Sequence, residues 1–197
     1  MLGSPPHEPQ REVLPLEERL YRAGQHVVRA RLFLDLWFYF EEKTTRAKII
    51  DAMREYNEFF RFTPHAYFVA YIVHIAAMFD RRKDTIRLPR LAKEMKMSRL
   101  LQGNSAAEVD RLLAEAAPIA SKVLVLRHYA FAHRSARISY DDAFKEAAVN
   151  PNQLHELTEV ALSIANCLLL ARGLKDEAFT TLPREDAEKM MKALAAT

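Results

Sequence analysis

The stretch from Asn150 to Gly173 reads NPNQLHELTEVALSIANCLLLARG and holds clear signals about the fold. Asparagine followed by proline is a typical helix start, because the asparagine side chain caps backbone N–H groups and proline fits the first turn. Glycine at the far end readily takes the left-handed conformation that closes a helix. The stretch therefore predicts a long helix over residues 151–172.

Helical periodicity extends outward from this stretch along nearly the whole chain. No pair of strands is indicated, and only 4 glycines in 197 residues argue against the many tight turns of an all-β fold. We therefore expect an all-α protein: an up-and-down bundle of four to five long helices, followed by a short C-terminal helix. The helices are predicted over residues 16–42, 45–61, 64–79, 105–133, 151–172 and 183–195.

Two of these helices have recognisable start signals. Thr63 precedes Pro64, a pattern that predicts an N-cap hydroxyl followed by proline at the first helical position. Ser105 and Glu108 have the spacing of a capping box, so we expect the next long helix to begin at Ser105. Pro118 should kink or restart that helix, because proline cannot donate a backbone hydrogen bond.

The chain divides into a tail, one bundle and an appendage. Residues 1–15 are rich in proline and lack an apolar signal core, so we expect a disordered tail and no secretion. Residues 16–173 form the bundle, and residues 174–197 a helical appendage. Leu32–Phe40 is apolar on most sides and should lie in the core or in a subunit contact. The longest uncharged apolar stretch, Ala66–Phe79, is shorter than the roughly 20 residues that span a membrane, so we expect a cytoplasmic protein.

The composition excludes several classes of site. The glycines lie far apart, so the chain has no P-loop and no dinucleotide-binding fingerprint. Cys167 is the only cysteine, which rules out an intrachain disulfide and a cysteine-cluster zinc site. None of the 7 histidines forms the HExxH spacing that places two metal ligands on one helix face. We therefore expect neither a metal nor a cofactor.

Charge is unevenly distributed. The net charge is only +3, yet residues 81–99 contain eight basic and two acidic residues, and residues 121–137 contain basic residues and no acid. Such segments are either solvated faces or surfaces that bind phosphate groups. We favour a solvated face for the first segment and a phosphate-binding surface for the second. The candidate RNA contacts are Lys122, Arg137, Arg81, Arg82 and Lys83.

The second basic segment also holds an arginine and a histidine six positions apart, Arg127 and His133. A guanidinium can hold two phosphate oxygens and stabilise the charge of a transition state. An imidazole can move a proton near neutral pH. Because the ribose 2′-hydroxyl supplies the nucleophile, these two side chains are sufficient for RNA cleavage without a metal.

Spacing alone does not select this pair, because the chain contains a second arginine and histidine at a similar spacing, Arg19 and His26, which are seven positions apart. Arg19 follows Glu17 and Glu18, whose carboxylates would compete with a substrate phosphate. Arg127, in contrast, lies in a segment without acidic residues. The local sequence therefore favours Arg127 and its partner histidine.

Helix geometry sets a further condition on this pair. On a straight helix, six residues separate the side chains of Arg127 and His133 by about 120° and about 9 Å. One helix therefore does not point both groups at one phosphate. Either the helix ends before His133, or a second subunit supplies part of the site across a two-fold axis.

At these residues the sequence resembles a known family. The segment Leu126–Arg134 is similar to the Arg-x(4–6)-His motif of the HEPN superfamily, small helical bundles of prokaryotic defence and toxin systems. Residues 79–91, which begin Phe-Asp-Arg, resemble the abortive-infection-type branch of that superfamily. The similarity spans roughly residues 20–172.

The resemblance implies a metal-independent endoribonuclease of a toxin or phage-defence system, which dimerises along its motif helices and leaves a 2′,3′-cyclic phosphate. Arg127 would bind and polarise the scissile phosphate, and His133 would transfer a proton or stabilise the leaving group. His128 and Arg134 would support them. The family often has asparagine where this chain has His128, which can also form hydrogen bonds. A subgroup has a modifiable tyrosine where this chain has Ser135, so control by tyrosine modification is not indicated.

Two other functions stay open. The chain could be a non-catalytic HEPN-like module that binds nucleic acid, a nucleotide or a partner protein, since many bundles have basic faces without chemistry. It could also be the helical partner in a two-gene toxin–antitoxin or nucleotidyltransferase system. The expected partners are thus RNA, a second copy of the chain, and an antitoxin or nucleotidyltransferase, and no membrane.

Overall fold

The computed structural model describes residues 13–82, 85–132 and 138–196. Within these ranges the chain forms α-helices and one π-helix, η1, and no strand, which confirms the all-α prediction. The elements are α1 (Leu16–Glu41), α2 (Lys43–Glu55), α3 (Asn57–Phe60), α4 (Thr63–Ala77), α5 (Leu88–Met97), α6 (Gly103–Leu126), η1 (Arg127–Ala132), α7 (Tyr140–Ala147), α8 (Pro151–Ala171) and α9 (Leu182–Leu194).

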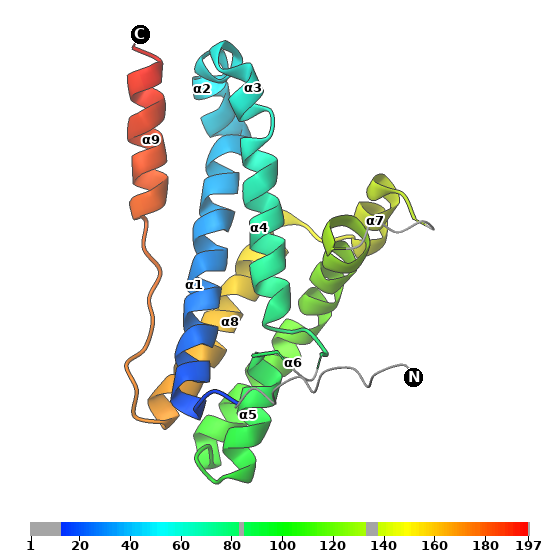
Figure 1. Ribbon diagram of the computed structural model, residues 1–197, viewed down its shortest axis with the longest axis vertical. Helices are drawn as coiled ribbons and strands as arrows, with labels where there is room; N and C mark the ends of the chain where they lie inside the picture. Colours follow the sequence, from blue (N-terminus) through cyan, green and yellow to red (C-terminus); the bar gives the residue numbers. More distant parts are fainter. Residues whose placement is uncertain (1–12, 83–84, 133–137, 197) are drawn as a thin grey trace, which may run out of the picture.

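Four long helices form the body of the bundle. α1 packs along α4 and α8, and α8 also packs along α6. In the view of Figure 1, α1 and α6 run upward and α4 and α8 run downward. The structure is therefore the up-and-down helical bundle that the sequence predicts, with α9 on the outer side of α1.

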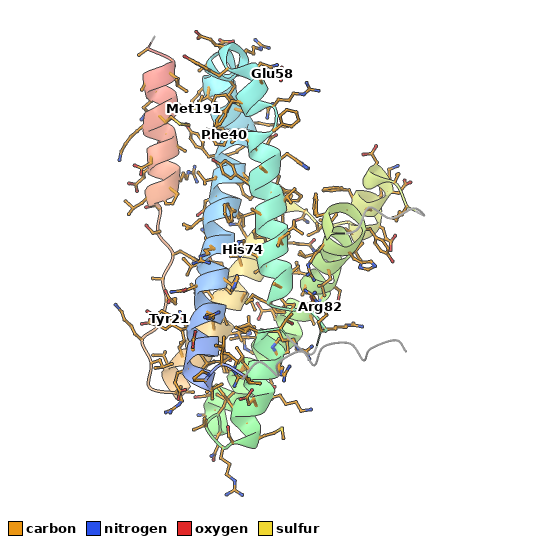
Figure 2. The ribbon with its side chains drawn as sticks, viewed as in Figure 1. Tyr21, Phe40, Glu58, His74, Arg82 and Met191 are labelled. Atoms are coloured by element: carbon orange, nitrogen blue, oxygen red, sulfur yellow. The ribbon has the colours of Figure 1, made fainter. Side chains whose placement is uncertain are left out.

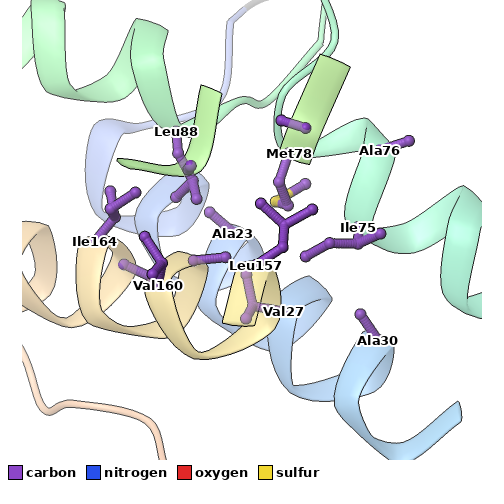
Figure 3. Packing of buried hydrophobic residues seen from close by; sticks show 14 of the residues in the cluster. Ala23, Val27, Ala30, Ile75, Ala76, Met78, Leu88, Leu157, Val160 and Ile164 are labelled. Carbon is purple, nitrogen blue, oxygen red and sulfur yellow. The ribbon is translucent and has the colours of Figure 1, made fainter. Parts of the chain in front are cut away.

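The main core lies between these four helices and α5, and it consists mostly of aliphatic side chains together with Phe68 and Tyr71 of α4. Figure 3 shows Val27 of α1, Ile75 of α4 and Leu157 of α8 meeting in this core, and all three are fully buried. Burying each such side chain contributes about 1.5–3 kcal/mol. Small residues such as Ala30 sit on the same face of α1, which leaves room for the neighbouring helices.

A second apolar cluster lies at the end of the bundle where α1 meets α2. Tyr39 and Phe40 of α1 are buried there against Phe60 of α3 and Met191 of α9. Figure 2 shows Phe40 and Met191 near each other at this end. The apolar segment Leu32–Phe40 is therefore half-buried or buried throughout, as expected for a core segment. The division of the chain at residue 173 stays a prediction.

Several predicted helix ends are confirmed. The Asn150 side chain accepts a hydrogen bond from the backbone N–H of Gln153 at 3.0 Å, and the Gln153 side chain accepts one from the backbone N–H of Asn150 at 3.3 Å, which completes a capping box. Gly173 follows the end of α8 with φ +73°, the left-handed conformation expected there.

Thr63, predicted as an N-cap, is instead the first residue of α4, and its hydroxyl donates to the carbonyl oxygen of Phe59 at 2.7 Å.

Other details of the predicted helices are wrong. The helix expected over 45–61 begins at Lys43 and is interrupted at Tyr56, whose φ of −106° and ψ of 44° are not helical. The Ser105 capping box does not form, because α6 already begins at Gly103 and the Glu108 carboxylate pairs with Arg111 at 2.7 Å. The sequence also gave no indication of α7.

Pro118 and the end of α6 need a separate correction. Pro118 lies inside α6, which is continuous from Gly103 to Leu126, so the proline does not restart the helix. The α-helix then passes into the π-helix η1 at Arg127 instead of continuing in the same form towards residue 133. The Arg127 side chain therefore stands at the junction between two types of helix.

One helix of the described residues, α8, is long and apolar enough by composition to span a membrane. Half of that apolar window is buried inside the bundle, between α1 and α6. A core helix of a soluble protein can have the same length and composition, so these properties are weak evidence that α8 spans a membrane.

Candidate functional site

Asp80, just beyond the end of α4, gathers three arginines from two parts of the chain. Its side-chain Oδ2 accepts hydrogen bonds from Nη1 of Arg127 at 2.5 Å and from Nε of Arg82 at 2.9 Å. Its backbone carbonyl oxygen accepts one from Nη1 of Arg87 at 3.0 Å. Asp80 is itself only 8% exposed, and among the described residues only Thr158 is another buried polar side chain.

The turn after α4 fixes the position of this carboxylate. The backbone N–H of Leu88 donates to the carbonyl oxygen of Met78 at 2.9 Å, which ties the start of α5 to the end of α4. The backbone N–H of Arg82 donates to Oδ1 of Asp80 at 3.3 Å, a local bond typical of an Asx turn. Asp80 is thereby held against the α6–η1 junction, although 47 residues separate it from Arg127.

The local helix type on the other side of the pair is unusual. π-Helices are rare and occur often at functional sites. Arg127 is the first residue of η1, and its guanidinium is 20% exposed. Further along η1, Phe131 packs against Phe68 of α4 and Phe144 of α7, with ring centroids 5.9 and 6.0 Å apart. Aromatic contacts of Phe131 thus hold one side of η1 against the core, while the Arg127 side chain points to a side that is partly open to solvent.

A cavity of about 600 Å³ opens beside this pair. It lies between the turn after α4 and the end of α6, where Figure 2 labels Arg82. Among the described residues, Asp80 is the only acid that lines it, whereas three arginines and a histidine line it. The lining residues are Asp80, Arg81, Arg82, Ser121, Leu124, Val125, Arg127, His128 and Tyr129.

The arginines control the ionisation of Asp80. Burial raises the pKa of this carboxyl, but hydrogen bonds from Arg127 and Arg82 outweigh the burial and lower the pKa to about 2. Asp80 is therefore ionised at neutral pH, and it already holds the Arg127 guanidinium. A phosphate group that binds Arg127 must share it with this carboxylate or displace the carboxylate.

This geometry corrects one step of the sequence analysis. Arg127 lies in an acid-free stretch of sequence, but in space it faces the carboxylate of Asp80. The alternative arginine, Arg19, is paired as expected, but with Glu94 and not with Glu17 or Glu18. Nη1 and Nη2 of Arg19 each donate to one carboxylate oxygen of Glu94, both at 2.6 Å. Proximity in sequence therefore did not identify the acid that competes at either arginine.

The structure brings together part of the predicted site. Arg81 and Arg82 from the first basic segment line one cavity with Arg127 and His128 from the second. Lys122 is not brought there, because its amino group donates to the carbonyl oxygen of Ala148 at 3.0 Å and to Gln153 at 3.2 Å. The other predicted site residues, Lys83, His133, Arg134 and Arg137, lie outside the described residues.

Three polar residues of the cavity were not predicted as site residues: Asp80, Ser121 and Tyr129. Asp80 was quoted only as part of the resemblance. Ser121 lies six positions before Arg127 and Tyr129 two after it. Neither spacing places two side chains on one helix face, so helical spacing gave no signal for either residue. Among the described residues, no three histidine, cysteine or acidic side chains lie close enough together to hold a metal ion.

Comparison with known families decides where the chain belongs. The family model HEPN_AbiU2, described as AbiU2, matches residues 14–190 of the 197. The chain belongs to the AbiU2 family of HEPN domains. Neither a curated protein nor a solved structure matches it.

Membership in the AbiU2 family confirms the resemblance to the abortive-infection-type branch of the HEPN superfamily, whereas the Arg-x(4–6)-His motif at Arg127 and His133 stays a prediction. The matched range covers every helix from α1 to α8 and most of α9. It thus includes both sides of the Asp80–Arg127 pair. The family match concerns the whole bundle and does not itself test the role of any one side chain.

Proposed function

We propose that this AbiU2-family protein is a metal-independent endoribonuclease that cleaves RNA at the Arg127 cavity. The observation that carries the proposal is the convergence of Arg81, Arg82, Arg127 and His128 on one cavity with a single carboxylate. These residues come from two basic segments that are distant in the sequence. Their convergence favours a phosphate-binding site over two separate solvated faces.

The charge and size of the cavity suit a nucleic-acid backbone. Three guanidinium groups against one carboxylate leave an excess of positive charge, which attracts phosphate. Arginine is also well suited to phosphate because its planar guanidinium can donate two parallel hydrogen bonds. The hydroxyls of Ser121 and Tyr129 add neutral groups that can bond to a ribose or a phosphate oxygen.

The proposed reaction is an internal transesterification. The ribose 2′-oxygen attacks the adjacent phosphorus, the bond from phosphorus to the 5′-oxygen breaks, and a 2′,3′-cyclic phosphate and a 5′-hydroxyl form. A base takes the proton from the 2′-hydroxyl, and an acid returns one to the leaving 5′-oxygen. In this proposal Arg127 stabilises the charge on the phosphorane-like transition state, and His133 transfers a proton.

We further propose that the active form is a homodimer. On a straight helix, the spacing of Arg127 and His133 would point the two side chains away from a common phosphate, so we expect a second copy to contribute one of them. This part of the proposal rests on helix geometry and on the family resemblance. RNA is the substrate, and an antitoxin or a nucleotidyltransferase partner would control the activity in a toxin or phage-defence system.

The test is RNA cleavage by purified protein in EDTA, with single-stranded and structured RNA as substrates. We expect products with 2′,3′-cyclic phosphate ends and a loss of about 10²-fold or more in rate for Arg127→Ala and His133→Ala. Arg22→Ala is the matched control, because Arg22 is an exposed arginine paired within its own helix. Unchanged cleavage in either site variant would remove that residue from the proposed mechanism.

Mixing the two inactive variants tests the shared site. If one copy supplies Arg127 and the other His133, an Arg127→Ala and His133→Ala heterodimer retains one intact site, and the mixture regains part of the activity. No recovery after verified subunit exchange would contradict a site shared between copies. A monomer at micromolar concentration by light scattering would also contradict it.

A non-catalytic RNA-binding module is the second candidate, and one observation favours it. Arg127 is already bonded to Asp80 at 2.5 Å, a geometry that a purely structural ion pair would also have. In that case RNA binding should weaken with salt and no cyclic-phosphate ends should appear. The cleavage assay above separates the two candidates directly.

A further inference from the structure

A second cavity, of about 590 Å³, lies at the end of the bundle where α1, α2 and α3 meet the start of α8. Its volume lies within the range of roughly 300–1,000 Å³ that is usual for small-molecule sites. None of its lining residues lines the Arg127 cavity. It is therefore a separate candidate site.

Aromatic rings form one wall of this cavity. Trp37, Phe60, Phe68 and Phe144 line it, from four different elements of the chain. The ring centroids of Trp37 and Phe68 lie 4.8 Å apart, and those of Phe68 and Phe144 lie 5.9 Å apart. Such a wall offers flat apolar surface to a flat ring, with edge and face contacts that favour aromatic partners.

The rim of the same cavity is basic. Arg46, Arg54 and Arg61 line it together with one acid, Glu41. Arg46 is satisfied by Glu41 at 2.7 Å. The charge of the two remaining arginines is therefore not neutralised by a carboxylate in the cavity lining.

Arg54 and Arg61 are both available to a ligand. Arg54 pairs with Asp51 at 3.2 Å, but these side chains are 73% and 91% exposed, and such a surface pair contributes about 0–1 kcal/mol. The Arg61 guanidinium rests over the ring of Phe62 at 5.3 Å, and no carboxylate of the described residues pairs with it. An incoming anion could bond to both groups at little cost.

We propose that this cavity binds a small aromatic anion, with its ring against Trp37 and Phe68 and its phosphate or carboxylate on Arg54 and Arg61. The combination of a flat apolar wall and two uncommitted guanidinium groups at its rim defines this class of ligand. Either a phosphate ester or a carboxylate fits the same two arginines. The proposal does not depend on ribonuclease activity.

The site would be linked to the helix that carries Arg127. The Phe131 ring of η1 lies 5.9 Å from Phe68 and 6.0 Å from Phe144, measured between centroids, and both of these rings line the cavity. A ligand that moves either ring therefore shifts the packing of η1. Ligand binding at this end is thus placed to influence the Arg127 cavity.

The test uses the fluorescence of Trp37, which is the only tryptophan in the chain and lines the cavity. The full-length protein is titrated with AMP as the phosphate probe and with phenylacetate as the carboxylate probe. Adenosine and ribose 5-phosphate are the controls that lack the charge or the ring. We expect a saturable change with AMP, with phenylacetate or with both, and at least tenfold weaker binding of the two controls.

Charge variants complete the test. We expect Arg54→Ala/Arg61→Ala to weaken binding at least tenfold, because the variant lacks both groups that hold the anion. Both arginines are exposed, so their removal does not open the core. Arg22→Ala/Arg172→Ala removes two exposed, ion-paired arginines at the other end of the bundle and should change binding less than twofold. Circular dichroism verifies that both proteins are folded.

Each outcome has a definite meaning. Binding of AMP alone identifies a phosphate ester as the ligand class, and binding of phenylacetate alone identifies a carboxylate. No saturable binding of either probe would overturn the proposal. Equal binding of adenosine and AMP, or equal losses in the two double variants, would overturn it as well, because the rim arginines would then have no specific role.

Discussion

Replacing Asp80 by asparagine tests the ion pair at the centre of the candidate site. Asparagine has nearly the same shape but no charge, so it removes the charge-assisted bonds to Arg127 and Arg82 while it leaves the turn after α4 intact. The three arginines around this position would then face one another without a counter-charge. We expect Asp80→Asn to be folded but less stable than the wild type.

The size of the effect follows from the pKa of Asp80. Burial alone would raise this pKa, but the Arg127 and Arg82 hydrogen bonds lower it from 3.8 to about 2. At 1.36 kcal/mol per pKa unit, that difference corresponds to about 2 kcal/mol. Since the cavity opens to solvent, which screens the pair, we expect a measured loss of about 1–2 kcal/mol at pH 7.

The pH dependence has a definite sign. Because the pKa is lower in the folded state, ionised Asp80 stabilises the fold fully at pH values well above 3.8. The stabilisation decreases as the pH falls through the folded-state pKa of about 2. At pH 3 about half of the contribution should remain, so the gap between wild type and variant should be about half its value at pH 7.

Urea unfolding, followed by Trp37 fluorescence and circular dichroism at pH 7 and pH 3, measures this gap. Asp186→Asn is the control, because Asp186 is an exposed acid whose pair with Lys189 at 3.1 Å lies on the surface. Equal stability of Asp80→Asn and wild type at pH 7 would show that the pair contributes nothing. A gap that does not change with pH would show that the loss comes from packing and not from charge.

Three further substitutions test the bundle itself, each by urea unfolding at pH 7. Leu157→Ala removes a fully buried side chain and should cost about 2–5 kcal/mol, whereas Leu170→Ala, at a 59% exposed position of the same helix, should cost under about 0.5 kcal/mol. Asn150→Ala removes the cap of α8 and should cost about 1 kcal/mol, and an unchanged midpoint would contradict the capping role. Gly173→Ala places a side chain at φ +73° and should cost about 1–2 kcal/mol, unless the backbone relaxes to another conformation.

The general fold was predictable from the sequence because its main signals are local. Asn150 and Gly173 mark the two ends of α8 through their own backbone preferences, and the structure uses both. The wrong details also have local causes. Ser105 has the spacing of a capping box, but α6 already begins at Gly103 and Glu108 turns to Arg111. Whether a side chain such as Glu108 caps the helix or pairs with a nearby arginine depends on the residues around it, which a spacing pattern does not include.

The site was less predictable because its key contact is not local. The sequence pointed to Arg127 and the basic residues around it, and the family resemblance added His128. It did not indicate that Asp80 bonds to Arg127, because the two are 47 positions apart and belong to separate elements. For the same reason, the two basic segments gave no sign that Arg81 and Arg127 would line one cavity.

The shortage of glycine bears on why an acid lies in the cavity where we propose that phosphate binds. With 4 glycines in the chain and no glycine-rich loop, the protein has no loop of backbone N–H groups to hold a phosphate, so side chains must do so. Arginines gathered for that purpose repel one another in the empty site, and a buried carboxylate such as Asp80 offsets the repulsion. The same carboxylate then competes with the phosphate for Arg127. Stability and phosphate binding therefore act in opposite directions on Asp80, and under the proposed function a phosphate on Arg127 must share the guanidinium with this carboxylate or displace it.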